Sequence, residues 1–135
     1  MIEKYLDDYY RNKLNGKEIQ RLEGITHKEF RSYFDKNGLQ TYRSLFDNFN
    51  FNGKLKKLLI SKYTSLSNRC QGKTGDKYGH YQGLDYLDLI EWIKYCNSNK
   101  AYIVKLWEEY INNGKQLKDA LSVDRIKNRQ GYTPS

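Results

Sequence analysis

Apolar side chains recur at steps of three and four residues along most of this chain, which is the period of a helix with one buried face. The segments 2–14, 54–70, 84–96 and 100–113 each carry one apolar stripe of this kind. A strand is plausible only at residues 121–126. The sequence therefore predicts a mainly α-helical protein with a short β segment close to its last residues.

Polar and glycine-containing breaks divide residues 1–45 into three predicted helices. Asn15-Gly16 ends the first helix. A second, short helix over residues 17–23 is expected to turn Ile19 and Leu22 inward. The turn Gly24-Ile25 then leads into the third helix.

Thr26 begins the third predicted helix, because Glu29 three positions later completes a capping box in which each side chain satisfies a backbone N–H. Asn37-Gly38 supplies the left-handed residue that typically ends a helix. The inner face of this helix is expected to consist of Phe30, Tyr33 and Phe34.

The spacing of the second and third helices is similar to that of the helix-turn-helix motif of DNA-binding proteins. The residues at the packing and turn positions of the motif are Ile19, Gly24, Ile25, Phe30 and Tyr33. The chain departs from the motif at Gln20, where a small residue is usual, and at Glu23, where an apolar one is common. The resemblance implies that the third helix reads DNA. The side chains expected to face the major groove or its phosphates are Thr26, His27, Lys28, Arg31 and Ser32.

Cationic side chains outnumber anionic ones by 24 to 16, which gives the chain a formal charge of +8 and an isoelectric point near 9.4. This balance favours a polyanionic partner, since binding releases counterions from phosphates. The alternative is that the basic residues only form solvated faces. Beside a helix-turn-helix pattern, three basic runs favour DNA. These runs are Lys54, Lys56 and Lys57, then Arg69, Lys73 and Lys77, then Arg125, Lys127 and Arg129.

No segment approaches the roughly 20 consecutive apolar residues of a membrane span, so we expect no membrane partner and a cytoplasmic location. Cys70 and Cys96 lie far apart without a C-x-x-C pair, so neither a zinc site nor a disulfide framework is indicated. Both are expected to be buried thiols. No heptad repeat or apolar seam specifies an oligomeric state.

A series of landmarks in residues 55–135 ends in a compact motif. In order, the landmarks are Ser67-Asn68-Arg69-Cys70, Tyr81-x-Gly83, Trp92, Trp107, S-V-D-R-I at 122–126 and G-Y-T-P at 131–134. The series resembles phage and mobile-element proteins of the HNH endonuclease superfamily. It implies an HNH-like helical region at 54–135 with an incomplete ββα core, and the helix-turn-helix resemblance implies a separate DNA-binding unit at 1–45.

On this resemblance Asp124 would hold a divalent ion such as Mg²⁺, and a histidine would draw a proton from the attacking water. The position of that general base holds Arg125. A guanidinium, with a pKa above about 12, cannot accept a proton at neutral pH, but it can clamp a phosphate through two donors. His80 is expected to be a surface or packing residue rather than a substitute base. The motif Asn would follow Ser135, so the catalytic set is expected to be incomplete.

Three functions follow from these features. The favoured one is a non-catalytic DNA-binding protein of phage or mobile-element origin, which needs no cofactor and gains further phosphate contacts from Arg69, Arg125, Lys127 and Arg129. The second is an HNH-type, homing-like endonuclease present as a truncated chain, which would require Mg²⁺ or Mn²⁺. The third is a phage-encoded inhibitor that docks on a host nucleic-acid enzyme.

Overall fold

The computed structural model describes residues 2–73 and 85–112, and every regular element within these ranges is an α-helix or a 3-10 helix. The predicted mainly α-helical fold is confirmed for this part of the chain, whereas the strand expected at residues 121–126 lies outside it. None of the described helices combines the length and apolar character needed to cross a membrane. The elements are η1 (Ile2–Tyr5), α1 (Leu6–Tyr10), α2 (Gly16–Glu23), α3 (His27–Lys36), η2 (Ser44–Asn48), α4 (Gly53–Cys70), α5 (Leu89–Ser98) and α6 (Lys100–Asn112).

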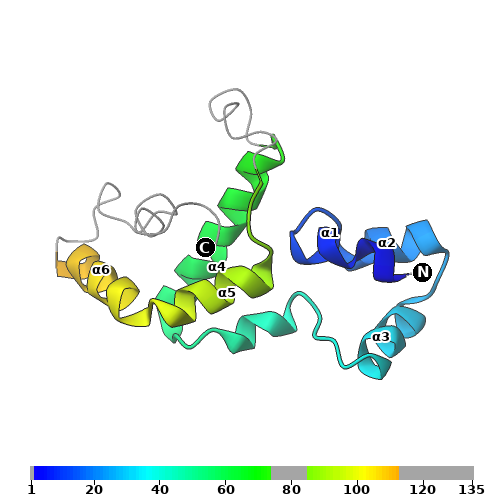
Figure 1. Ribbon diagram of the computed structural model, residues 1–135, viewed down its shortest axis with the longest axis horizontal. Coiled ribbons are helices and arrows are strands. Elements are labelled where there is room, and N and C mark those ends of the chain that lie inside the picture. The colour runs from blue at the N-terminus through cyan, green and yellow to red at the C-terminus, as the bar shows by residue number, and fades with distance from the viewer. Residues whose placement is uncertain (1, 74–84, 113–135) are drawn as a thin grey trace.

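Two groups of helices share one hydrophobic core. Helices α1, α2 and α3 lie on one side of the molecule and α4, α5 and α6 on the other, with the segment 39–52 between them (Figure 1). Buried side chains from both groups belong to a single cluster. The connecting segment contributes Leu45, Phe49 and Phe51 to this core.

The first helix is shorter than its apolar period predicts. A helix was expected over residues 2–14, but η1 and α1 end at Tyr10, and Asn12 adopts a left-handed backbone with φ 62°. Asparagine tolerates this conformation better than most residues do. Leu14 nevertheless packs against the core beyond the turn. The apolar period therefore continues past the end of the helix and does not mark it.

The capping box predicted at the start of α3 is confirmed. The Glu29 N–H donates to Thr26 Oγ1 at 3.1 Å, and the Thr26 N–H donates to Glu29 Oε1 at 3.1 Å. Gly38 ends the helix with φ 62°, as expected, and the Leu39 N–H donates to the Phe34 carbonyl at 2.9 Å. Local sequence chemistry thus determines both ends of this helix.

The buried face of α2 differs from the predicted one. Ile19 is fully buried, but Leu22 is 56% exposed, so the inward placement of Leu22 was wrong. The 3-10 helix η1 packs against α2, and Lys4 Nζ lies 3.7 Å from the Glu23 carboxylate. Because Glu23 follows Ile19 by one turn, these two residues share the covered face and Leu22 lies beside it.

Helix α5 begins later than the predicted residue 84. Asp88 caps it: the Glu91 N–H donates to Asp88 Oδ1 at 2.8 Å, and the Asp88 N–H donates to Glu91 Oε1 at 3.1 Å. Tyr86 and Leu87 are buried in the segment that precedes this cap. They extend the apolar stripe without being helical, and the predicted start was therefore too early.

Hydrogen bonds fix the turn after α1 to the second group of helices. The buried Tyr63 hydroxyl on α4 donates to the Leu87 carbonyl at 2.9 Å and lies 3.2 Å from the Tyr10 carbonyl. The Tyr86 hydroxyl donates to the Arg11 carbonyl at 2.8 Å. Because buried backbone carbonyls are costly to leave unpaired, these bonds hold the two groups at a defined position.

Buried tyrosines, among them Tyr10 and Tyr63, predict a loss of stability at alkaline pH. Burial, the largest cause, raises the pKa of Tyr10 to about 12 and also raises the pKa of Tyr63. In the unfolded chain both titrate at about pH 10. Their contribution to stability should be complete below about pH 10 and should fall above it, by roughly 1.4 kcal/mol per pH unit for each tyrosine. Urea denaturation at about pH 8 and about pH 11 measures the loss.

The Tyr63→Phe variant is the control for this pH dependence. It removes one of the buried tyrosine hydroxyls whose pKa is raised, so its unfolding free energy should fall less steeply than that of the wild type above about pH 10. Equal slopes for the two proteins would show that Tyr63 does not titrate in the unfolding reaction.

Candidate nucleic-acid interface

A concave surface runs between α3, the segment 41–43 and the start of α4. It consists of two adjoining cavities of about 280 Å³ and about 710 Å³, which share Arg31, Thr41 and Arg43. We call them together the basic groove, the smaller one the aromatic cavity and the larger one the lysine cavity. The aromatic cavity is lined by Tyr9, Asn12, Leu14, Asn15, Gly16, His27, Phe30, Arg31, Thr41, Tyr42 and Arg43. The lysine cavity is lined by Arg31, Thr41, Arg43, Ser44, Phe46, Asp47, Gly53, Lys56, Lys57 and Ile60.

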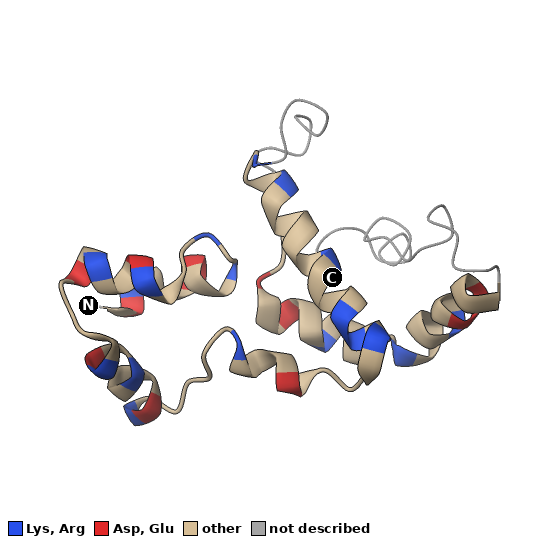
Figure 2. Ribbon diagram, turned by 180° about the vertical axis from the view of Figure 1, so that it is seen from behind, with Lys and Arg blue, Asp and Glu red and all other residues tan. Residues whose placement is uncertain are grey.

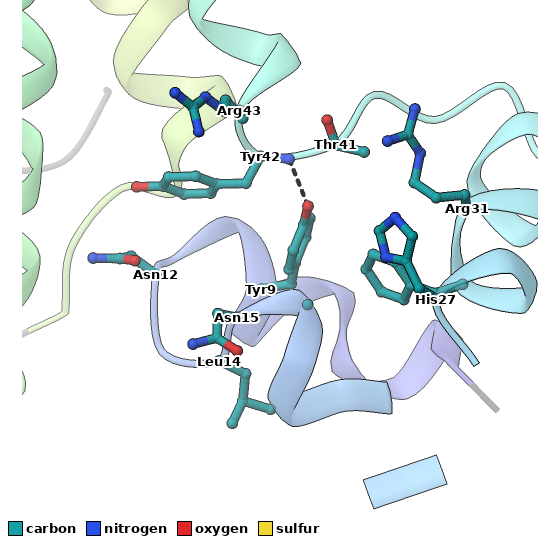
Figure 3. Close-up of a pocket in the computed structure, with 11 residues that line it drawn as sticks. Tyr9, Asn12, Leu14, Asn15, His27, Arg31, Thr41, Tyr42 and Arg43 are labelled. Carbon is teal, nitrogen blue, oxygen red and sulfur yellow. Dashed lines mark hydrogen bonds between the residues drawn. The ribbon is translucent and has the colours of Figure 1, made fainter. Parts of the chain in front are cut away.

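Helix α3 presents His27 and Arg31 to the groove from consecutive turns. Both side chains are exposed, whereas Phe30 and Phe34 are buried with their ring centroids 4.8 Å apart. Figure 3 shows His27 and Arg31 side by side on α3, across from Thr41. The packing of the two phenylalanines therefore fixes the direction in which the polar side chains point.

Two tyrosines form the opposite wall of the aromatic cavity. The Tyr42 N–H donates to the Tyr9 hydroxyl at 2.6 Å, the dashed line in Figure 3, and the two rings meet edge to face at 6.1 Å between centroids. Burial, the largest cause, raises the pKa of Tyr9, although the Tyr42 N–H and the charge of Arg31 lower it. Burial also raises the pKa of Tyr42. This wall is therefore aromatic and uncharged at neutral pH.

The groove carries four cationic side chains against one carboxylate. Arg31, Arg43, Lys56 and Lys57 line it, and Asp47 is the one acidic residue among its described lining. Lys56 Nζ lies 3.8 Å from Asp47, but this carboxylate side chain is 85% exposed, so the pair is weak. Within residues 2–73 and 85–112, no ion pair involves Arg31, Arg43 or Lys57. Figure 2 shows basic bands on α3, on the segment leading into η2 and at the start of α4. These charges are available to an anionic ligand.

Two of the five residues predicted to read DNA, His27 and Arg31, line the groove. Thr26 Oγ1 is engaged with Glu29 in the capping box. Lys28 is exposed and Ser32 half-buried on α3, and neither belongs to the groove lining. Lys56 and Lys57 at the start of α4, which the sequence assigned to a separate basic run with Lys54, lie in the same groove as Arg31, whereas Lys54 does not line it.

The other predicted contacts lie elsewhere. Arg69 is in the last turn of α4, about 20 Å along the helix from Lys56, so it belongs to a different part of the surface. Burial raises the pKa of the neighbouring Cys70 thiol, and the charge of Arg69 partly offsets this rise. The residues Asp124, Arg125, Lys127 and Arg129, together with His80, lie outside the described residues.

The sequence interpretation missed Arg43. Its segment has no helical period, and the contact that positions it, Tyr42 with Tyr9, joins residues far apart in the chain. A basic residue beside an aromatic one in a polar loop was the available indication.

The described residues contain no cluster of the side chains that usually bind a metal ion. Within residues 2–73 and 85–112, no three His, Cys, Asp or Glu side chains gather in positions to hold a metal ion. Cys70 and Cys96 are buried thiols, as predicted.

Comparison with known proteins found no protein-family model, curated protein or solved structure that matches this chain. Function is therefore inferred from the geometry and the charge of the basic groove and from the sequence motifs.

Proposed function

We propose that this protein binds DNA, with the basic groove and the exposed face of α3 as its contact surface. The observation that carries the proposal is the convergence of Arg31, Arg43, Lys56 and Lys57 from three separate segments onto one concave surface. Arginine and lysine are the main phosphate ligands in DNA complexes, and an arginine can hold two phosphate oxygens at once. If the basic residues only formed solvated faces, lysines and arginines of different segments would not be expected to gather in one groove.

The helix-turn-helix interpretation supplies an orientation for the DNA. Helices α2 and α3 contact each other, and Gly24 adopts φ 64° in the turn between them. His27 and Lys28, at the start of α3, are exposed. In a helix-turn-helix protein the first residues of the reading helix meet base edges in the major groove. On this proposal His27 and Lys28 reach the bases, while Arg31 and the cations of the lysine cavity hold phosphates.

The proposal predicts that DNA affinity depends strongly on salt. If four side chains each neutralise one phosphate, log affinity should fall with log salt concentration at a slope of about −3 to −4. Fluorescence anisotropy of a labelled duplex, measured from about 50 to about 200 mM salt, gives this slope. An affinity that stays constant over this range would mean that the groove does not bind phosphates.

HNH-type cleavage is the second candidate function, and it rests on the motif at residues 122–134. Because Arg125 stands where the superfamily usually places its base, we expect binding without cleavage. Supercoiled plasmid incubated with the protein and Mg²⁺ or Mn²⁺ should stay intact. Cleavage that the Asp124→Ala variant abolishes would instead identify the protein as a nuclease.

A further inference from the structure

The aromatic cavity has a lining that phosphate binding does not require. Cations alone suffice to hold a DNA backbone, yet the rings of Tyr9, Phe30 and Tyr42 wall this cavity. Its volume of about 280 Å³ is close to the lower end of small-molecule sites, which span roughly 300–1,000 Å³. A cavity of this size suits a single flat ring system rather than a larger ligand.

Two arginines connect this cavity to the phosphate-binding surface. Arg31 and Arg43 line both the aromatic cavity and the lysine cavity, so they stand where the two meet. A ligand held at this junction would place an aromatic group on one side and an anion on the other. A nucleotide has this construction, because its base is joined through a sugar to a phosphate.

We infer that the aromatic cavity receives a nucleobase, either an unpaired base of a DNA strand or the base of a free nucleotide, with the adjoining phosphate on Arg31 and Arg43. For an unpaired base of a DNA strand, the inference rests on the proposed DNA binding. Bases stack on aromatic side chains without sequence preference, and proteins can hold a base outside the duplex in such a pocket. The exposed His27 ring on α3 also lines this cavity and can hydrogen-bond a base edge.

Three probes test the assignment on the full chain: a strand of about twelve thymidines, an abasic sugar-phosphate strand of equal length, and thymidine 5′-monophosphate. The two strands carry the same backbone charge and differ only in their bases. The thymidine strand should bind at least about tenfold more tightly than the abasic strand, because stacked bases add to the phosphate contacts.

Matched variants then locate the effect. Tyr42→Leu removes the ring while keeping an apolar side chain, so the affinity ratio of the two strands should fall toward one, whereas Tyr42→Phe should preserve the ratio. The His27→Ala variant should also lower this ratio. Because His27 is exposed, whereas Tyr42 is half-buried, this second variant is a test that does not perturb the core. Lys36→Ala, exposed in the last turn of α3, should leave the ratio unchanged.

The possible outcomes separate this inference from the proposed function. If both strands bind with equal affinity, the base assignment is overturned and phosphate binding stands. If only the mononucleotide binds and Tyr42→Leu abolishes that binding, the cavity is a free-nucleotide site and the proposed DNA binding is overturned. If none of the three probes and no duplex binds, both are overturned.

Discussion

The Trp92→Ala variant is expected to lose about 3–5 kcal/mol of unfolding free energy, the largest stability effect that we predict. The Trp92 ring on α5 is 0% exposed, and its centroid lies 6.0 Å from that of Tyr95 and 6.4 Å from that of Tyr63. Its Nε1–H donates to the Leu59 carbonyl on α4 at 3.2 Å. Truncation therefore leaves a cavity and also removes a buried hydrogen bond between the two helices. Urea denaturation followed by circular dichroism measures the loss.

Trp107→Ala is the matched control for this variant. Trp107 on α6 is only partly buried, and it packs against the core cluster rather than inside it. Its replacement should cost clearly less, because part of its ring surface is already in contact with water. Equal losses for the two variants would show that the buried cluster around Trp92 is not the centre of the core.

The double variant Arg31→Ala and Arg43→Ala should lower the affinity for duplex DNA by about a hundredfold at moderate salt. Each arginine is expected to contribute about tenfold through a charge-assisted contact with phosphate. The slope of log affinity against log salt concentration should become shallower by about two, since two phosphate contacts are lost. Anisotropy titrations at several salt concentrations give both quantities.

The control for this variant removes the same number of charges elsewhere. Lys94 on α5 and Lys105 on α6 are exposed and do not line the groove. The double variant Lys94→Ala and Lys105→Ala should therefore bind DNA within about twofold of the wild type. If both double variants weaken binding equally, the affinity depends on net charge and the groove has no special role.

The features that could be predicted from the sequence are those that depend on neighbouring residues. Helix α3 begins with the capping box of Thr26 and Glu29 and ends at a glycine. Both features depend on residues within a few positions of one another, so the sequence alone predicts them. The helical period likewise identified α4, and α6 as far as its last described residue. His27 and Arg31, two of the residues expected to contact DNA, line the basic groove, and their contact with DNA stays a prediction.

The features that could not be predicted depend on tertiary contacts. The first helical segment ends at Tyr10, and Asn12 follows it in a left-handed turn. In this turn the Arg11 carbonyl accepts a hydrogen bond from the hydroxyl of Tyr86, which is distant in sequence. Leu22 is exposed because η1 covers the neighbouring face of α2. Arg43 reaches the groove because its segment is tied to Tyr9, which is distant in sequence. An apolar period specifies that a face is buried, but not which element covers it.

The most direct test of DNA binding by the basic groove is a titration of isotope-labelled protein with a short duplex, followed through the backbone amide signals by nuclear magnetic resonance. The groove predicts chemical-shift changes concentrated at the start of α3, in the segment 41–43 and in the first turns of α4, with little change in α6. Changes confined to α5 and α6, or no change at a duplex concentration that saturates the anisotropy signal, would contradict it.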